Sequence, residues 1–302
     1  MTAGDSSPQP ERGGPSRKRV DWRVRGAIAA AFLVAGIALL AKDWWGERAS
    51  LKASLREARA ANAEESVEAH ARRLERTHGI HIGYGNPADF WVPPFKPQDA
   101  TAPWIDIKPA DPADVAISLN GVEAALQQYP PGFVSKLIKA IFICGELRMQ
   151  HERASGAVAL AWVIISARPD YGAEGLREVG FSSLHHELSS LVLRADTGSL
   201  AKWAKFAPAG WPFVEDPGGA LRRAETAAPS LDTGFLSAYG ATNLENDFNV
   251  YAEKMFGNPE EVARLAREHP LIRQKLDFVM ATYAAIDPAF TGLFRKMKLA
   301  GQ

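Results

Sequence analysis

Two apolar runs near the middle of the chain constrain its fold most strongly. They read LIKAIFICGEL (137–147) and AVALAWVIISA (157–167). Both are rich in Ile and Val and are bounded by charged or glycine-containing loops, which is typical of buried sheet strands. Helical patterns follow, over about 178–193, 244–256, 260–284 and 287–297. Strands followed by helices predict an α+β domain.

The sequence indicates that this domain covers 79–302 and is preceded by a helical stalk. The string GIHIGYG (79–85) predicts the first strand of the domain. Residues 47–77 contain no Gly or Pro and are mostly Ala, Glu, Arg and Leu, so we expect a helix within 46–78. Its apolar stripe is thin and its heptads do not persist, which favours a stalk over a sustained coiled coil.

The N-terminal part of the chain predicts a disordered tail and a membrane anchor. Residues 1–25 are polar, basic and rich in Gly, Pro and Ser. The next sixteen residues, Gly26–Ala41, carry no charge. As a helix they would reach about 24 Å, short of the ~30 Å hydrocarbon core. Arg25 and Lys42 can snorkel and a Trp pair at 44–45 can lie at the headgroups, which makes up the difference.

A cleaved signal peptide and a buried helix are the alternatives for this segment. The apolar region is long for a signal peptide, and LLAK is a poor cleavage site. A buried helix would not need so basic a flank on one side. We therefore expect residues 26–45 to be a single-pass anchor in the bacterial cytoplasmic (inner) membrane. The positive-inside rule places residues 1–25 in the cytoplasm and the C-terminal domain outside it.

Composition excludes several other classes. Lys plus Arg and Asp plus Glu both number 35, so the chain lacks the basic excess of a nucleic-acid-binding protein. Cys144 is the sole cysteine, which excludes an intrachain disulfide and a cysteine zinc cage. No G-x-S-x-G string is present, which makes a serine hydrolase a weak alternative.

The string FSSLHHELSSLVL (181–193) begins like the helix of a zinc protease. His186 and Glu187 fill the first two places of H-E-x-x-H, and Ser190 stands at the second histidine. On a helical wheel His186 and Ser190 share a polar face opposite the leucines. A ligand at i and a second at i+4 lie one above the other, with the Glu at i+1 beside the metal-bound water.

Together with GFLSAYGATNLENDFNVYAEKMF (234–256), this helix resembles a bacterial family of zinc-binding metallopeptidases with a gluzincin-like layout, whose members are often lipoproteins or envelope proteins. In that family an HHEFxH-type helix is followed about fifty residues later by a GFVSxYA…NEDFAE-type segment. The resemblance covers about 80–295. It implies a zincin-like α+β fold, a Zn²⁺ ion and a peptide or protein substrate.

Matched residue by residue, the resemblance places the first histidine ligand on His186 and the general base on Glu187. The second histidine falls on Ser190 and the third ligand on Asn246, so two of three ligands are altered. Asp247 is the best substitute ligand. His185 could replace His186 but lies nearer the apolar face, and we expect His185, Asn246 and Ser190 to line the same site.

Neighbouring carboxylates are less suitable on sequence grounds. Glu253 lies nearly two turns after Asp247, and Glu245 is predicted to belong to a capping box with Thr242. We expect the 178–193 helix to pack under the sheet and the 244–256 helix to bring its Asn246/Asp247 end toward His186.

Two functions follow from these positions. The first is a zinc-dependent peptidase of the cell envelope in which Glu187 polarises the attacking water. The second is a non-catalytic protein of the same fold that binds a peptide or protein partner. The altered ligands favour the second, and the retained His186–Glu187 pair favours the first.

Overall fold

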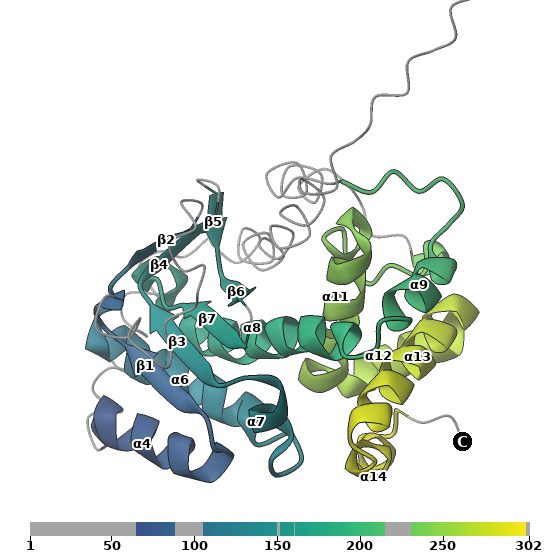
Figure 1. Ribbon diagram of the computed structural model, residues 1–302. Helices are drawn as coiled ribbons and strands as arrows, with labels where there is room; N and C mark the ends of the chain where they lie inside the picture. The colour runs from purple at the N-terminus through teal and green to yellow at the C-terminus, as the bar shows by residue number, and fades with distance from the viewer. Residues whose placement is uncertain (1–64, 88–104, 150–151, 160, 215–230, 300–302) are drawn as a thin grey trace, which may run out of the picture.

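The computed structural model describes residues 65–87, 105–149, 152–159, 161–214 and 231–299 (Figure 1). The predicted tail, the anchor and most of the stalk lie outside these ranges. Within them, no helix has both the length and the apolar character needed to cross a membrane. The described part of the chain is an α+β structure, as the sequence predicts.

The main sheet has four strands in the order β1-β3-β7-β6. Strands β1 (His81–Tyr84), β3 (Ala140–Cys144) and β7 (Trp162–Ser166) run parallel, and β6 (Gly156–Ala159) pairs with β7 antiparallel at one edge. Every residue of β3 and β7 is buried, Cys144 included, as predicted for strands covered on both faces.

Each apolar run contains two strands and not one. The first run leaves the main sheet after Cys144 and continues as β4 (Glu146–Met149). This strand is the centre of a second, antiparallel sheet with β2 (Ile105–Lys108) and β5 (Glu152–Ala154). A Cβ at Gly145 would lie 2.2 Å from the carbonyl oxygen of Pro109, so glycine permits the change of sheet. The second run folds back as the β6–β7 hairpin.

Three helices contact the main sheet. Helix α4 (Val67–His78) packs against β1, α6 (Pro112–Leu126) against β3, and α8 (Gly172–Arg194) against β6 and β7. Ala71 and Leu74 of α4 are buried. The last twelve residues of the predicted stalk are therefore part of the packed domain.

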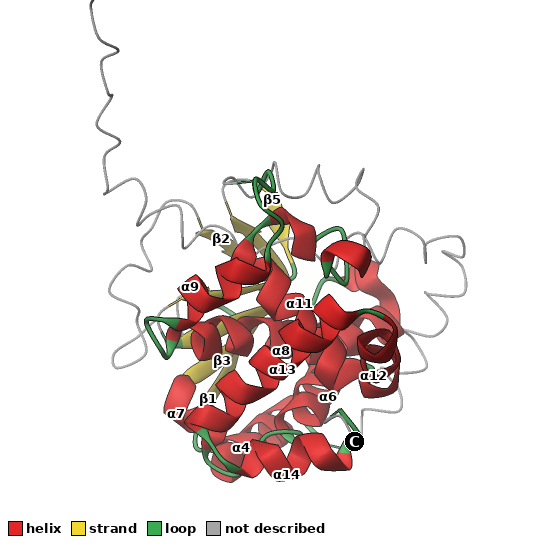
Figure 2. Ribbon diagram, turned by 90° about the vertical axis from the view of Figure 1, so that its right-hand side faces the viewer, coloured by secondary structure: helices red, strands yellow, loops and turns green. Residues whose placement is uncertain are grey.

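The C-terminal half is helical and lies beside the sheet half (Figure 1), and in the view turned by 90° its helices lie in front of the strands (Figure 2). The helix predicted over 260–284 is two helices, because Pro270 has no amide hydrogen for an interior helical bond and starts α13 instead. The remaining elements are α7 (Phe133–Leu137), η1 (Pro169–Tyr171), α9 (Ser199–Trp203), η2 (Ala204–Phe206), η3 (Leu231–Thr233), η4 (Gly240–Thr242), α11 (Leu244–Gly257), α12 (Pro259–Glu268), α13 (Pro270–Ile286) and α14 (Ala289–Lys296).

Helix α8 connects the two halves, since it contacts the sheet and α6 as well as α11 and α13 (Figure 1). Two glycines permit its close approach to α6. A Cβ at Gly121 would lie 2.0 Å from the carbonyl oxygen of Arg177, and one at Gly180 would lie 2.3 Å from that of Ser118. The α6–α8 contact therefore fixes the position of α8, which carries the His-Glu pair.

Candidate functional site

Helix α8 is buried on both of its faces. The leucine face and the polar face with His186, Ser189 and Ser190 are all enclosed, because α11 covers the polar side. The expectation that α8 packs under the sheet is confirmed by its contacts with β6 and β7. Its polar side chains therefore lie at a helix–helix interface.

Three contacts define an antiparallel pairing of α8 with α11. His186 Nδ1 bonds the carboxylate of Glu253, Asn249 bonds both Ser189 and Ser190, and Arg194 pairs with Glu245. As the residue number rises on α8 it falls on α11. The Asn246/Asp247 end of α11 therefore lies toward the C-terminal end of α8, and the prediction that this end approaches His186 is wrong.

His186 is 4 % exposed, and only one of its two ring nitrogens has a hydrogen-bond partner within the described ranges. Its Nδ1 contacts Glu253, which the sequence argument set aside, and the ring of Tyr239 lies 5.9 Å away between centroids. Its Nε2 has no hydrogen-bond partner among the residues that the structure describes. A buried polar atom without a partner is uncommon in folded proteins and calls for an explanation.

Glu187 is 1 % exposed and lies against the edge strand β6. A Cβ at Gly156 would come within 2.6 Å of Glu187 Oε1, so this carboxyl group lies close to the backbone of β6. Burial raises the pKa of Glu187 well above its ordinary value, and Glu245 and Glu253 add to that rise. Neither Glu187 Oε2 nor Ser183 Oγ, one turn earlier on α8, has a partner within the described ranges.

Ser190, at the place of the second histidine, belongs to a neutral hydrogen-bond network with Asn249. Asn249 Nδ2 donates to Ser190 Oγ at 2.9 Å, and Ser189 Oγ donates to Asn249 Oδ1 at 2.6 Å. All three side chains are fully buried. The sequence argument did not identify Asn249. Its spacing of four from Glu253 was the available indication, because residues four apart share a helix face.

His185 lies in an aromatic cluster and not beside His186. Its Nδ1 is 2.6 Å from the hydroxyl of Tyr129, and its ring stacks on Phe256 with 4.5 Å between centroids. Burial lowers the pKa of His185 to about 3, so the imidazole is neutral at physiological pH. The prediction that His185 lines the same site is wrong, because it is a core residue.

Asn246 and Asp247 also bond residues other than His186. Asn246 Nδ2 donates to Thr242 Oγ1 at 2.9 Å, and its backbone amide donates to the side chain of Asn243. Asn243 is therefore the N-cap of α11, and the predicted capping box of Thr242 and Glu245 is wrong. Asp247 Oδ2 accepts a hydrogen bond from Lys275 Nζ on α13 at 2.7 Å.

The Asp247–Lys275 pair is a buried structural contact. Lys275 also donates to the carbonyl oxygen of Gly234 at 2.9 Å and lies 4.4 Å from the centroid of the Phe235 ring. Burial raises the pKa of Asp247 to about 7, while the charge of Lys275 acts in the opposite direction. A carboxylate held in this way is unavailable to a metal ion near His186.

The donors around His186 do not fit a catalytic zinc ion. Such a site needs three protein ligands, drawn from imidazole, carboxylate and thiolate groups. Here one imidazole nitrogen has no partner among the described residues, while Ser190 and Asn249 offer neutral oxygen and amide groups that already bond each other. Across the described ranges, no group of three or more His, Cys, Asp or Glu residues could hold a metal ion.

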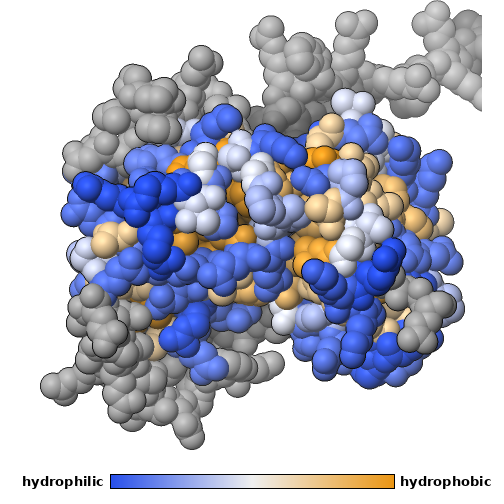
Figure 3. All heavy atoms as spheres, turned by 90° about the horizontal axis from the view of Figure 1, so that it is seen from below, coloured by the Kyte–Doolittle hydropathy of each residue, from blue (hydrophilic) through white to orange (hydrophobic). Residues whose placement is uncertain are grey.

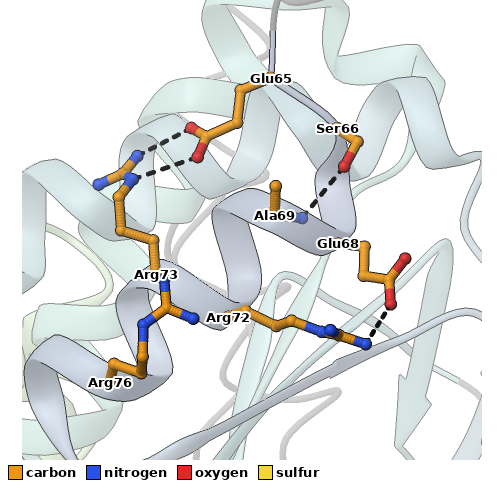
Figure 4. Close-up of a pocket in the computed structure, with 7 residues that line it drawn as sticks. All are labelled: Glu65, Ser66, Glu68, Ala69, Arg72, Arg73 and Arg76. Atoms are coloured by element: carbon orange, nitrogen blue, oxygen red, sulfur yellow. Dashed lines mark hydrogen bonds and ion pairs between the residues drawn. The ribbon is translucent and has the colours of Figure 1, made fainter.

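Two surface depressions lie away from this site. One, of about 380 Å³, lies on α4 (Figure 4). Its Arg72 and Arg73 already bond Glu68 and Glu65, and exposed pairs of this kind contribute little energy. The other is a groove of about 310 Å³ between α8, α9 and α13, with Phe278, Asp196 and Lys202 among its lining residues.

The described surface offers little apolar area for a partner. Leu200 is the only large hydrophobic side chain there that is exposed. The face seen from below is mostly hydrophilic, with smaller apolar areas between the charged residues (Figure 3).

Comparison of the chain with protein-family models, curated proteins and solved structures found no match.

Proposed function

We propose that this chain is a membrane-anchored, zincin-like protein of the bacterial envelope that binds a peptide or protein partner without cleaving it. The observation that carries the non-catalytic part of the proposal is the Ser189–Asn249–Ser190 network, and the partner class follows from the resemblance to peptidases. The network occupies the side of α8 where a second zinc ligand would have to lie, and it supplies only neutral groups. Without a metal ion, Glu187 has no bound water to polarise.

The zincin-like part of the proposal is supported by the position of the His-Glu helix. Helix α8 packs under the antiparallel edge strand β6, and Glu187 lies directly against Gly156 of that strand. Packing of this helix under the sheet is what the resemblance to zinc metallopeptidases leads us to expect. Fold alone does not determine activity, so the argument against catalysis rests on the donor groups.

A zinc-dependent peptidase is the second candidate. The free Nε2 of His186 favours it, because metal-binding histidines often donate their other ring nitrogen to a carboxylate, as His186 does to Glu253. The two candidates differ in whether peptide bonds are broken.

A pool of synthetic peptides incubated with the full chain and excess Zn²⁺ tests this difference. We expect a subset of peptides to be retained by the immobilised protein and recovered intact by mass spectrometry. Glu187→Gln should retain the same subset. Cleavage products that are lost with Glu187→Gln would establish the peptidase, and retention of no peptide would contradict the binding function.

The membrane anchor rests on residues 26–45 and is tested separately. We expect a reporter enzyme fused after residue 302 to be active in the extracytoplasmic compartment only. Cytoplasmic activity of this fusion would overturn both the topology and the location.

A further inference from the structure

We infer that Ser190 and Asn249 stand at the two ligand positions that this domain lacks, and that Glu253 is a positioning residue for His186. The inference rests on the proposed zincin-like, metal-free site and refines it. Matching of the sequence motifs placed the third ligand at Asn246. The contact between α8 and α11 places it at Asn249 instead.

The pairing of α8 with α11 determines which residues can meet. His186 and Ser190 are four residues apart, about 6 Å along the helix axis. Glu253 and Asn249 are also four apart and lie opposite them in reverse order. The four side chains therefore form two facing pairs, one from each helix.

Asn249 is the side chain of α11 that meets Ser190 of α8, where a metal ligand from α11 would have to lie. Its amide nitrogen is 2.9 Å from Ser190 Oγ, so longer groups at 190 and 249 would approach the same small volume. Asn246 bonds Thr242 on its own side of α11, and Asp247 bonds Lys275 on α13. Within the described ranges, neither of these side chains forms a hydrogen bond with α8.

His186 is already oriented as a metal ligand would be. A carboxylate on one ring nitrogen fixes the imidazole and leaves the other nitrogen free for the metal. Glu253 bonds Nδ1, and Nε2 is buried without a partner among the described residues. Glu253 thus orients the His186 ring as a carboxylate orients a metal-binding histidine, although the other metal ligands are absent.

Two double variants of the full chain, purified in detergent, distinguish position 249 from position 246. Ser190→His with Asn249→Glu should bind about one Zn²⁺ per chain after dialysis against buffered zinc. The matched control, Ser190→His with Asn246→Glu, adds the same groups and should bind no more zinc than the wild type. Elemental analysis measures the zinc, and the Tm should rise on zinc addition for the first variant only.

Folding is checked by circular dichroism and cooperative melting in the presence of zinc. Ser190→His with Asn249→His provides a second version without a new buried carboxylate. Equal zinc in the 249 and 246 variants, or zinc in the 246 variant alone, would overturn the assignment. It would also be overturned if neither 249 variant bound zinc, whether folded or not.

The role of Glu253 is tested in the zinc-binding variant. Glu253→Gln should weaken zinc affinity about 10–100-fold in competition with a chelator, as expected for loss of a carboxylate behind a ligating histidine. An unchanged affinity would show that Glu253 only packs against His186.

These outcomes are separable from those of the proposed function. Zinc bound by the wild type would contradict the metal-free site, whichever position binds in the variants. A metal-free wild type combined with failure of the 249 variants would contradict this inference alone.

Discussion

At the scale of single residues, four buried polar side chains of α8 each have an atom without a hydrogen-bond partner in the described part of the chain. They are Ser183, His185, His186 and Glu187, which lie within about one turn of each other. Leaving a buried polar group unpaired costs about 1–3 kcal/mol. The fold retains these groups even though less costly apolar residues would fill the same space.

Glu187 gives a pH-dependent prediction at this scale. Because burial raises its pKa above the unfolded value, its carboxyl group favours folding below about pH 4.5, and this contribution is lost as pH rises through the folded pKa. Glu187→Gln cannot ionise, so its free energy of unfolding relative to wild type should increase from pH 5 to pH 8.

Urea denaturation at several pH values measures this difference. The exposed Glu260 on α12, replaced by Gln, provides the control for loss of a surface carboxyl group. An equal pH dependence for Glu187→Gln and wild type would mean that the carboxyl group is ionised in the folded protein.

At the scale of elements, the position of α8 depends on its contact with α6. Gly180 allows the α8 backbone to approach Ser118, and a methyl group there would lie 2.3 Å from a carbonyl oxygen. We expect Gly180→Ala to lower the free energy of unfolding by about 1–3 kcal/mol, the usual cost of overpacking.

Gly292 of α14 is the matched control for Gly180→Ala. A Cβ at Gly292 meets nothing within 4 Å, so Gly292→Ala should raise stability by up to about 1 kcal/mol through helix propensity. Both variants are compared by urea denaturation. A neutral Gly180→Ala would show that the two helices can separate without cost.

The elements themselves were more predictable than their pairing. The strand at 79–85 and the helix at 244–256 followed from local pattern, and both are present as β1 and α11. Apolar periodicity could not show that the first run changes sheet at Gly145. His186 and Glu187 were identified from the string alone. Glu253 and Asn249 were not, because contacts between helices distant in sequence determine which residues of α11 face α8.

At the scale of the whole molecule, α8 connects a sheet half to a helical half (Figure 1), and the candidate site lies along α8, where β6 lies against Glu187 and α11 bonds His186. The interface of α8 with α11 is closed by bonds between side chains. The Ser189–Asn249–Ser190 network places neutral groups beside His186, and the Asp247–Lys275 pair holds a carboxylate away from it.

The zinc content of the full chain tests the central claim most directly. The wild type and His186→Ala are purified in parallel without added metal and analysed for zinc per chain. Because one imidazole and two neutral side chains make a poor zinc site, we predict clearly less than one zinc per chain in both proteins. One zinc per chain in the wild type, lost in His186→Ala, would contradict the account and make the zinc peptidase the first candidate.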